Sequence, residues 1–125
     1  PMLTYADLAV QIFERQNTTS TLEYTQALTL KSGALRILKR YATAEKTLYA
    51  VLQNQTTTSA DQDSKLATTS DLCLTQWEAG RLDVAEKTAF TYLDAAKKKG
   101  EKHPETAKAL LLLAKIYKDM GKKEA

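Results

Sequence analysis

The sequence is poor in the residues that interrupt regular structure. Its 125 residues include four glycines and two prolines, whereas β-sandwiches and barrels need many turn residues between their strands. This scarcity favours an all-α fold. No apolar run approaches the roughly 20 residues that a helix needs to cross a bilayer, so we expect no membrane span.

Cysteine and histidine each occur once, as Cys73 and His103. A lone cysteine cannot form an internal disulfide, and the first 15 residues lack the basic-then-apolar order of a signal peptide, so a cytoplasmic protein is expected. One cysteine and one histidine cannot supply the three or four ligands of a typical metal site. We therefore expect a packed thiol at Cys73, a capping or loop role for His103, and no metal or cofactor.

Motifs that carry chemistry are also missing. The sequence has no phosphate-binding glycine loop, nucleophile elbow or His-Glu-x-x-His pattern, so we do not expect an enzyme. Residues 97–125 carry nine lysines and only four acidic side chains. A lysine-rich region of this kind can bind nucleic acid or another anionic surface, but no aromatic residue is interleaved with Lys97–Lys99 and Lys102. This function is therefore kept as an alternative to the one developed below, and nucleic acid is not the expected partner.

An internal repeat is the most informative feature of the chain. The segment 39–47 aligns with 80–88 at an offset of 41 residues, and both copies contain Ala-Glu-Lys-Thr. A further 41 residues lead to Gly121-Lys122-Lys123-Glu124-Ala125, which begins a third copy. Three small residues, Ser32, Cys73 and Ala114, share one line of this register, which suggests that two helix backbones approach closely there.

Apolar spacing predicts the helices. Leu110, Leu113, Ala114 and Tyr117 recur at the period of one helix face, and Pro104 suits the first turn of that helix. Gly80 and Gly121 lie where the chain has to reverse. We predict helices over residues 3–16, 21–38, 41–54, 62–79, 82–98 and 104–120. They form an N-terminal helix in residues 1–20, which is either the end of a preceding repeat or a cap, then repeats in 21–61 and 62–102, and a partial repeat in 103–125.

These units resemble the tetratricopeptide (TPR) repeat family. The resemblance rests on the small residue and following aromatic in Ala114 and Tyr117, on the turn glycine Gly80, and on Ala85 after it. The 41-residue spacing, longer than the usual 34, and the segment 99–107 are similar to the long-repeat variety found in kinesin light chains. Lys39 departs from the pattern at the first turn, where it replaces the glycine. The resemblance implies an α-solenoid, a right-handed superhelix of antiparallel helix pairs, that acts as a non-catalytic scaffold or adaptor.

In that family the first helix of each unit lines a concave groove that holds a peptide of a partner protein. Carried over to this sequence, the resemblance implies groove residues on three helices: Gln26, Thr29, Arg36, Ser70, Leu74, Trp77, Lys108, Leu111, Lys115 and Lys118, with Ile37, Ala67, Glu78 and Asp119 beside them. The basic side chains suit an acidic ligand, and Trp77 with Leu74 suits an apolar anchor. The lysines can equally form a solvated helix face, and Trp77 can equally pack in the core.

A second hypothesis is an architectural segment that stacks on neighbouring repeats or on another copy of itself. The apolar stretch from Leu3 to Phe13 is the feature that suggests it, because such a face is normally covered by a neighbouring element.

Overall fold

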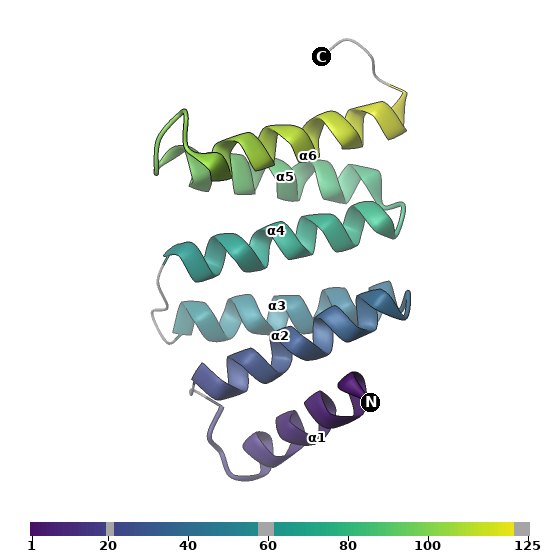
Figure 1. The fold of residues 1–125 in the computed structure, drawn as a ribbon, viewed down its shortest axis with the longest axis vertical. Helices are drawn as coiled ribbons and strands as arrows, with labels where there is room; N and C mark the ends of the chain where they lie inside the picture. Colours follow the sequence, from purple (N-terminus) through teal and green to yellow (C-terminus); the bar gives the residue numbers. More distant parts are fainter. Residues whose placement is uncertain (20–21, 58–61, 122–125) are drawn as a thin grey trace. The chain divides into compact units, whose positions relative to one another are not determined.

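The computed structural model describes residues 1–19, 22–57 and 62–121, and it contains six helices and no strand within these residues (Figure 1). The helices are α1 (Met2–Arg15), α2 (Leu22–Ile37), α3 (Tyr41–Thr57), α4 (Gln62–Glu78), α5 (Leu82–Lys97) and α6 (Pro104–Met120). The predicted helix ends differ from these by three residues at most. Residues 58–61 and 122–125, which include most of the third copy of the repeat, lie outside the described part of the chain.

The chain divides into two compact units, Pro1–Thr68 and Thr69–Ala125, called unit 1 and unit 2 below, and the boundary between them lies within α4. In unit 1, α1 packs against α2 and α2 packs against α3; in unit 2, α5 packs against α6. The fold is therefore all-α, with consecutive helices packed against each other, as the sequence predicts.

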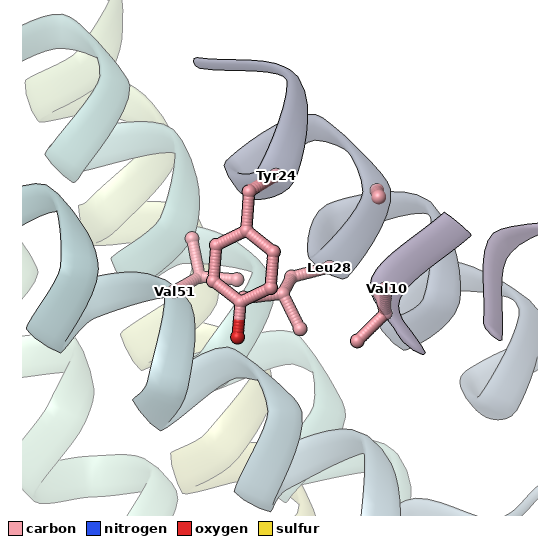
Figure 2. Close-up of a cluster of buried hydrophobic side chains, with 5 residues drawn as sticks. Val10, Tyr24, Leu28 and Val51 are labelled. Carbon is pink, nitrogen blue, oxygen red and sulfur yellow. The ribbon is translucent and has the colours of Figure 1, made fainter. Parts of the chain in front are cut away.

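Three helices share the core of unit 1. Figure 2 shows Val10 of α1, Tyr24 and Leu28 of α2, and Val51 of α3 gathered in one buried cluster. The rings of Phe13 and Tyr24 pack edge to face, with their centroids 6.3 Å apart, a geometry that aromatic pairs prefer. At the rim of this core, the Tyr24 hydroxyl donates to Glu14 at 3.0 Å. These contacts bury one stripe of each helix, which is what the period of the apolar residues requires.

Polar contacts between helices recur in the core of unit 2. The hydroxyl of Thr88 in α5 donates to the buried Gln76 amide oxygen of α4 at 2.6 Å. The Cys73 thiol, fully buried, lies 3.5 Å from the carbonyl oxygen of Ala85. A cysteine side chain that touches the backbone of the next helix means that α4 and α5 approach closely at this point. The prediction of a packed thiol at Cys73 is confirmed.

The same tight turn recurs at the 41-residue spacing. Lys39, Gly80 and Gly121 all have a left-handed backbone, with φ of 61°, 79° and 78°. At the first two turns the backbone N–H of the following residue donates to a carbonyl in the last turn of the helix. Arg40 donates to Leu35 at 2.8 Å, and Arg81 donates to Gln76 at 3.0 Å. This hydrogen bond closes a helix end and needs the left-handed residue before it. Lys39 therefore adopts a left-handed conformation although it carries a side chain, whereas glycine occupies this position at the other two turns.

Candidate interaction surface

Three of the predicted groove residues lie on α2 of unit 1. Gln26 and Thr29 are exposed, and Arg36 is half-buried. The Thr29 hydroxyl donates to the Thr25 carbonyl of its own helix at 2.9 Å, a local bond that serves the helix. The exposure of these residues and this local bond do not by themselves mark a ligand site.

The other seven lie on α4 and α6 of unit 2. Ser70, Leu74 and Trp77 are half-buried on α4, at the spacing of one helix face. On α6 the exposed positions are Lys108, Leu111, Lys115 and Lys118. Ser70 hydrogen-bonds Tyr92 of α5, so its hydroxyl supports the packing of α4 on α5. The ammonium of Lys108 lies 3.9 Å from the Glu105 carboxylate, one turn earlier on α6.

Trp77, Lys115 and Asp119 come together on the surface of unit 2, and we call them the Trp77 cluster. The indole Nε1–H of Trp77 donates to Asp119 Oδ2 at 2.6 Å. The Lys115 ammonium lies 5.6 Å from the centroid of the same ring, close enough for a cation–π attraction of about 0.5–1 kcal/mol at an exposed site. The hydrogen bond fixes the ring edge and the lysine lies over the ring face. The aromatic side chain is therefore held in one orientation while it stays partly exposed.

Asp119 is the member of the cluster that sequence reasoning undervalued. The resemblance placed it beside the groove and gave it no role, whereas the structure makes its carboxylate the partner of the indole. Its position four residues after Lys115 puts both on one helix face, so their place on the same face was readable from the sequence. The pairing with Trp77 was not, because it depends on the distance between two helices.

Two further contacts between tyrosine and glutamate fasten α6 to α5. The buried Tyr92 hydroxyl donates to the Glu105 carboxylate. Burial is the main cause that raises the pKa of Tyr92, and the hydrogen bond to Glu105 raises it further. Tyr117 hydrogen-bonds Glu86, and this bond is the main reason that the pKa of Tyr117 is raised. Both pairs hold the two helices in register. The exposed residues of α6 are thereby presented on a fixed support.

His103 acts as a helix cap, as predicted. Its Nδ1 accepts the backbone N–H of Glu105 at 3.1 Å, and Pro104 occupies the first turn of α6. This bond satisfies one of the amides that a helix start leaves free. The lysines 97–99 and Lys102 are all exposed around the end of α5, where positive charge complements the helix dipole.

Two kinds of feature are absent from the described residues, a cluster of metal ligands and a helix that could cross a membrane. Across residues 1–19, 22–57 and 62–121, no group of three or more His, Cys, Asp and Glu side chains is arranged to hold a metal ion. In the same ranges no helix combines the length and the apolar character that a bilayer crossing needs.

Comparison with known proteins does not add a family. A scan against models of protein families finds no match, and a search of curated proteins finds no similar sequence.

Proposed function

We propose that this chain is a non-catalytic protein-binding scaffold, and that the Trp77 cluster is where an acidic peptide segment of a partner binds. The peptide lies against α6, its carboxylates pair with the exposed lysines, and an apolar side chain of the peptide packs on the indole. The proposal includes the TPR-like arrangement that the sequence resembles, in which stacked helix pairs form a right-handed superhelix and α2, α4 and α6 line its groove.

The geometry of the Trp77 cluster is the observation that carries this proposal. Tryptophan dominates the binding energy of many protein interfaces when it is held in a defined place. Here the hydrogen bond to Asp119 and the contact with Lys115 hold the ring before any partner arrives, so less side-chain entropy is lost on binding. The neighbouring exposed charges, Lys108 and Lys118, favour a ligand of negative charge.

Trp77 is the only tryptophan, so its fluorescence reports on the proposed site alone. We would titrate the protein with a short peptide that carries several glutamates around one leucine, and with the same peptide in which lysines replace the glutamates. The acidic peptide is expected to change the emission saturably, and the effect is expected to weaken with salt because exposed charges are screened. The basic peptide is expected to leave the emission unchanged.

Variants locate the binding site. Lys115→Glu replaces an attraction of up to about 1 kcal/mol by a repulsion, so the acidic peptide should bind at least fivefold more weakly. Lys87→Glu reverses an exposed lysine on α5 and serves as the matched control, with little change expected. Equal weakening by both variants would show that only net charge matters, and the proposed site would be wrong.

Self-association is the second candidate, because α1 presents an unusually apolar outer face. Four of its large apolar side chains are 44–71% exposed: Met2, Tyr5, Leu8 and Ile12. In the repeat register the positions of Tyr5 and Ile12 correspond to Lys46 and Gln53 on α3. At these two positions the outer face of α3 is therefore more polar than that of α1, and contiguous exposed apolar surface often marks an interaction site.

Sedimentation equilibrium tests this candidate. A mass that rises with concentration in the wild type, and stays at one copy in Tyr5→Glu, would establish association through α1. Tyr49→Glu, at an aromatic residue of α3 with 49% exposure, is the control that should still associate. A wild type that remains a single copy at high concentration would eliminate self-association.

A further inference from the structure

The first turn of the repeat carries an aliphatic side chain at a surface position that is acidic in the other two. Ile37 ends α2 and Leu38 follows it in the turn to α3 (Figure 1), and their side chains are 69% and 54% exposed. At the 41-residue spacing, Ile37 corresponds to Glu78 and Asp119. Both of these are exposed as well, so the repeat places this position at the surface at every turn.

The charge around Ile37 and Leu38 is positive. Residues 24–57, which hold most of α2 and all of α3, contain five basic residues and one acidic residue, whereas the corresponding residues 65–98 contain five of each. The one acidic residue, Glu45, is 7% exposed and contributes little negative charge to the surface. Lys39 and Arg40 follow the apolar pair directly and are exposed. We call residues 36–40, which begin with Arg36, the first-turn tip.

The backbone at Lys39 is a second sign that the residues of this tip have a role. Its φ of 61° lies in the left-handed region, and glycine occupies the corresponding positions, Gly80 and Gly121. Strained backbone that is kept in a residue other than glycine often accompanies function. A lysine at this position places a positive charge next to Leu38, which glycine does not provide.

The backbone of the tip is fully hydrogen-bonded within α2. Three successive amides donate to carbonyls in the last two turns of the helix: Leu38 to Ala34 at 3.0 Å, Lys39 to Arg36 at 2.9 Å and Arg40 to Leu35 at 2.8 Å. A backbone amide without a partner is costly to bring into an apolar medium. Because these amides already have partners, the tip can enter the boundary between lipid headgroups and acyl chains without that cost.

An anionic bilayer surface matches this combination of side chains. Aliphatic groups gain from burial at the edge of the acyl chains, cations gain from anionic headgroups, and stable anchoring usually needs both. A protein partner would need a pocket shaped to two side chains on a turn, whereas a fluid bilayer adapts to them. The lysine-rich segment 97–102 contains no apolar side chain, so it offers only one of the two contributions.

We propose that the first-turn tip binds the surface of a bilayer that contains anionic lipid. Ile37 and Leu38 insert between the headgroups, and Lys39 and Arg40 contact the lipid phosphates and carboxylates. The contact is peripheral, because it uses a turn and not a spanning helix. It does not depend on peptide binding at the Trp77 cluster.

Vesicle co-sedimentation tests the apolar contribution. The wild type should bind vesicles of phosphatidylcholine and phosphatidylserine in equal amounts at least about tenfold more tightly than vesicles of phosphatidylcholine alone, and added salt should weaken the difference. Ile37→Gln combined with Leu38→Ala leaves the net charge unchanged and should bind the mixed vesicles at least about tenfold more weakly. The second turn has Glu78 and Ala79 at these positions, so the variant should fold, which circular dichroism checks. Equal binding by this variant and the wild type would overturn the proposal.

A matched pair of lysine variants tests the position of the charge. Lys39→Gln removes one cation of the tip and should weaken binding to the mixed vesicles by about fivefold. Lys102→Gln removes an exposed cation from the lysine-rich segment and should leave binding unchanged. Equal weakening by the two variants would show that only the overall charge matters, and the tip would not be the site.

A fluorophore on the tip reports on insertion. Leu38→Cys carries an environment-sensitive dye, which leaves the buried Cys73 unlabelled, and its emission should shift to the blue on the mixed vesicles. Tyr49→Cys, at an exposed position of α3, is the control whose emission should stay unchanged. An equal shift at both positions would contradict insertion through the tip.

The short acidic peptide separates this inference from the proposed function. Ile37→Gln with Leu38→Ala should leave peptide binding unchanged, and Trp77→Phe should leave vesicle binding unchanged. Loss of both ligands in the tip variant would show that the tip binds acidic protein segments, and would refute a lipid surface as its partner. A wild type that binds neither kind of vesicle would refute the proposal and leave the function proposed for the Trp77 cluster standing.

Discussion

The left-handed turn at Lys39 offers a direct measure of how strictly the repeat constrains the backbone. An L-residue in this conformation costs about 1–2 kcal/mol, whereas glycine adopts it freely and loses about 0.5–1 kcal/mol more entropy on folding than other residues do. The difference favours glycine by about 0.5–1 kcal/mol. Lys39→Gly is therefore expected to stabilise the protein, although replacement by glycine usually destabilises.

Gly80 provides the reverse experiment at the corresponding position. A Cβ at Gly80 would meet no atom within 4 Å, so Gly80→Ala adds backbone strain without a steric clash. It should lower the free energy of unfolding by about 0.5–1 kcal/mol. Gly33 is the control, because it lies inside α2 and a Cβ there would also meet nothing within 4 Å. Gly33→Ala should raise the free energy by about 0.5–1 kcal/mol, as expected in a helix interior.

Thermal and urea unfolding followed by circular dichroism measures all three variants. A change of 1 kcal/mol in a unit of this size shifts its melting temperature by about 4–8 °C, which is well resolved. The two Gly→Ala changes should move stability in opposite directions, and Lys39→Gly should move it up. A loss of stability in Lys39→Gly would refute the conclusion that the turn residue is strained.

Further predictions concern the core of unit 2. Burial raises the pKa of the Cys73 thiol from 9.0 to about 11, so iodoacetamide should react with Cys73 at pH 8 only when urea unfolds the unit. The unfolded chain therefore loses the thiol proton at a lower pH than the folded protein does. The contribution of the buried, protonated thiol to the free energy of unfolding is complete below about pH 9 and is lost as the pH rises towards 11. Urea unfolding across that range should show a smaller pH dependence in Cys73→Ala than in the wild type. Tyr92→Phe removes the donor to the Glu105 carboxylate and should cost about 1–2 kcal/mol in urea unfolding. Tyr5→Phe, at a ring that is 71% exposed, is the control and should cost little.

The sequence predicts helices well because each local signal agrees with the others. At α6, proline in the first turn, a capping histidine, an apolar stripe and a final glycine all point to the same helix, and the structure has it at residues 104–120. The turn at Lys39 is the informative exception. Lysine has no preference for a left-handed backbone, and only the 41-residue alignment with Gly80 identifies the position.

Side-chain pairings between helices are harder to predict. The spacing on α6 shows that Lys115 and Asp119 share a face, but the contact with Trp77 depends on how closely α4 approaches α6. The same applies to Tyr92 and Glu105, where the sequence suggests only a helix-dipole role for the glutamate. Burial also separates residues that the family resemblance treats alike: Ser70 supports the packing of α5, while Leu111 remains open to solvent.

The indole N–H resonance of Trp77 tests the central claim most directly. The protein has one tryptophan, so its nitrogen–proton NMR spectrum contains one such signal, and that proton is hydrogen-bonded to Asp119. On titration with the acidic peptide we expect the signal to shift saturably in the wild type. The dissociation constant read from this shift should be at least fivefold higher in Lys115→Glu than in the Lys87→Glu control. A signal that stays in place while the peptide binds would show that the Trp77 cluster is not the binding surface.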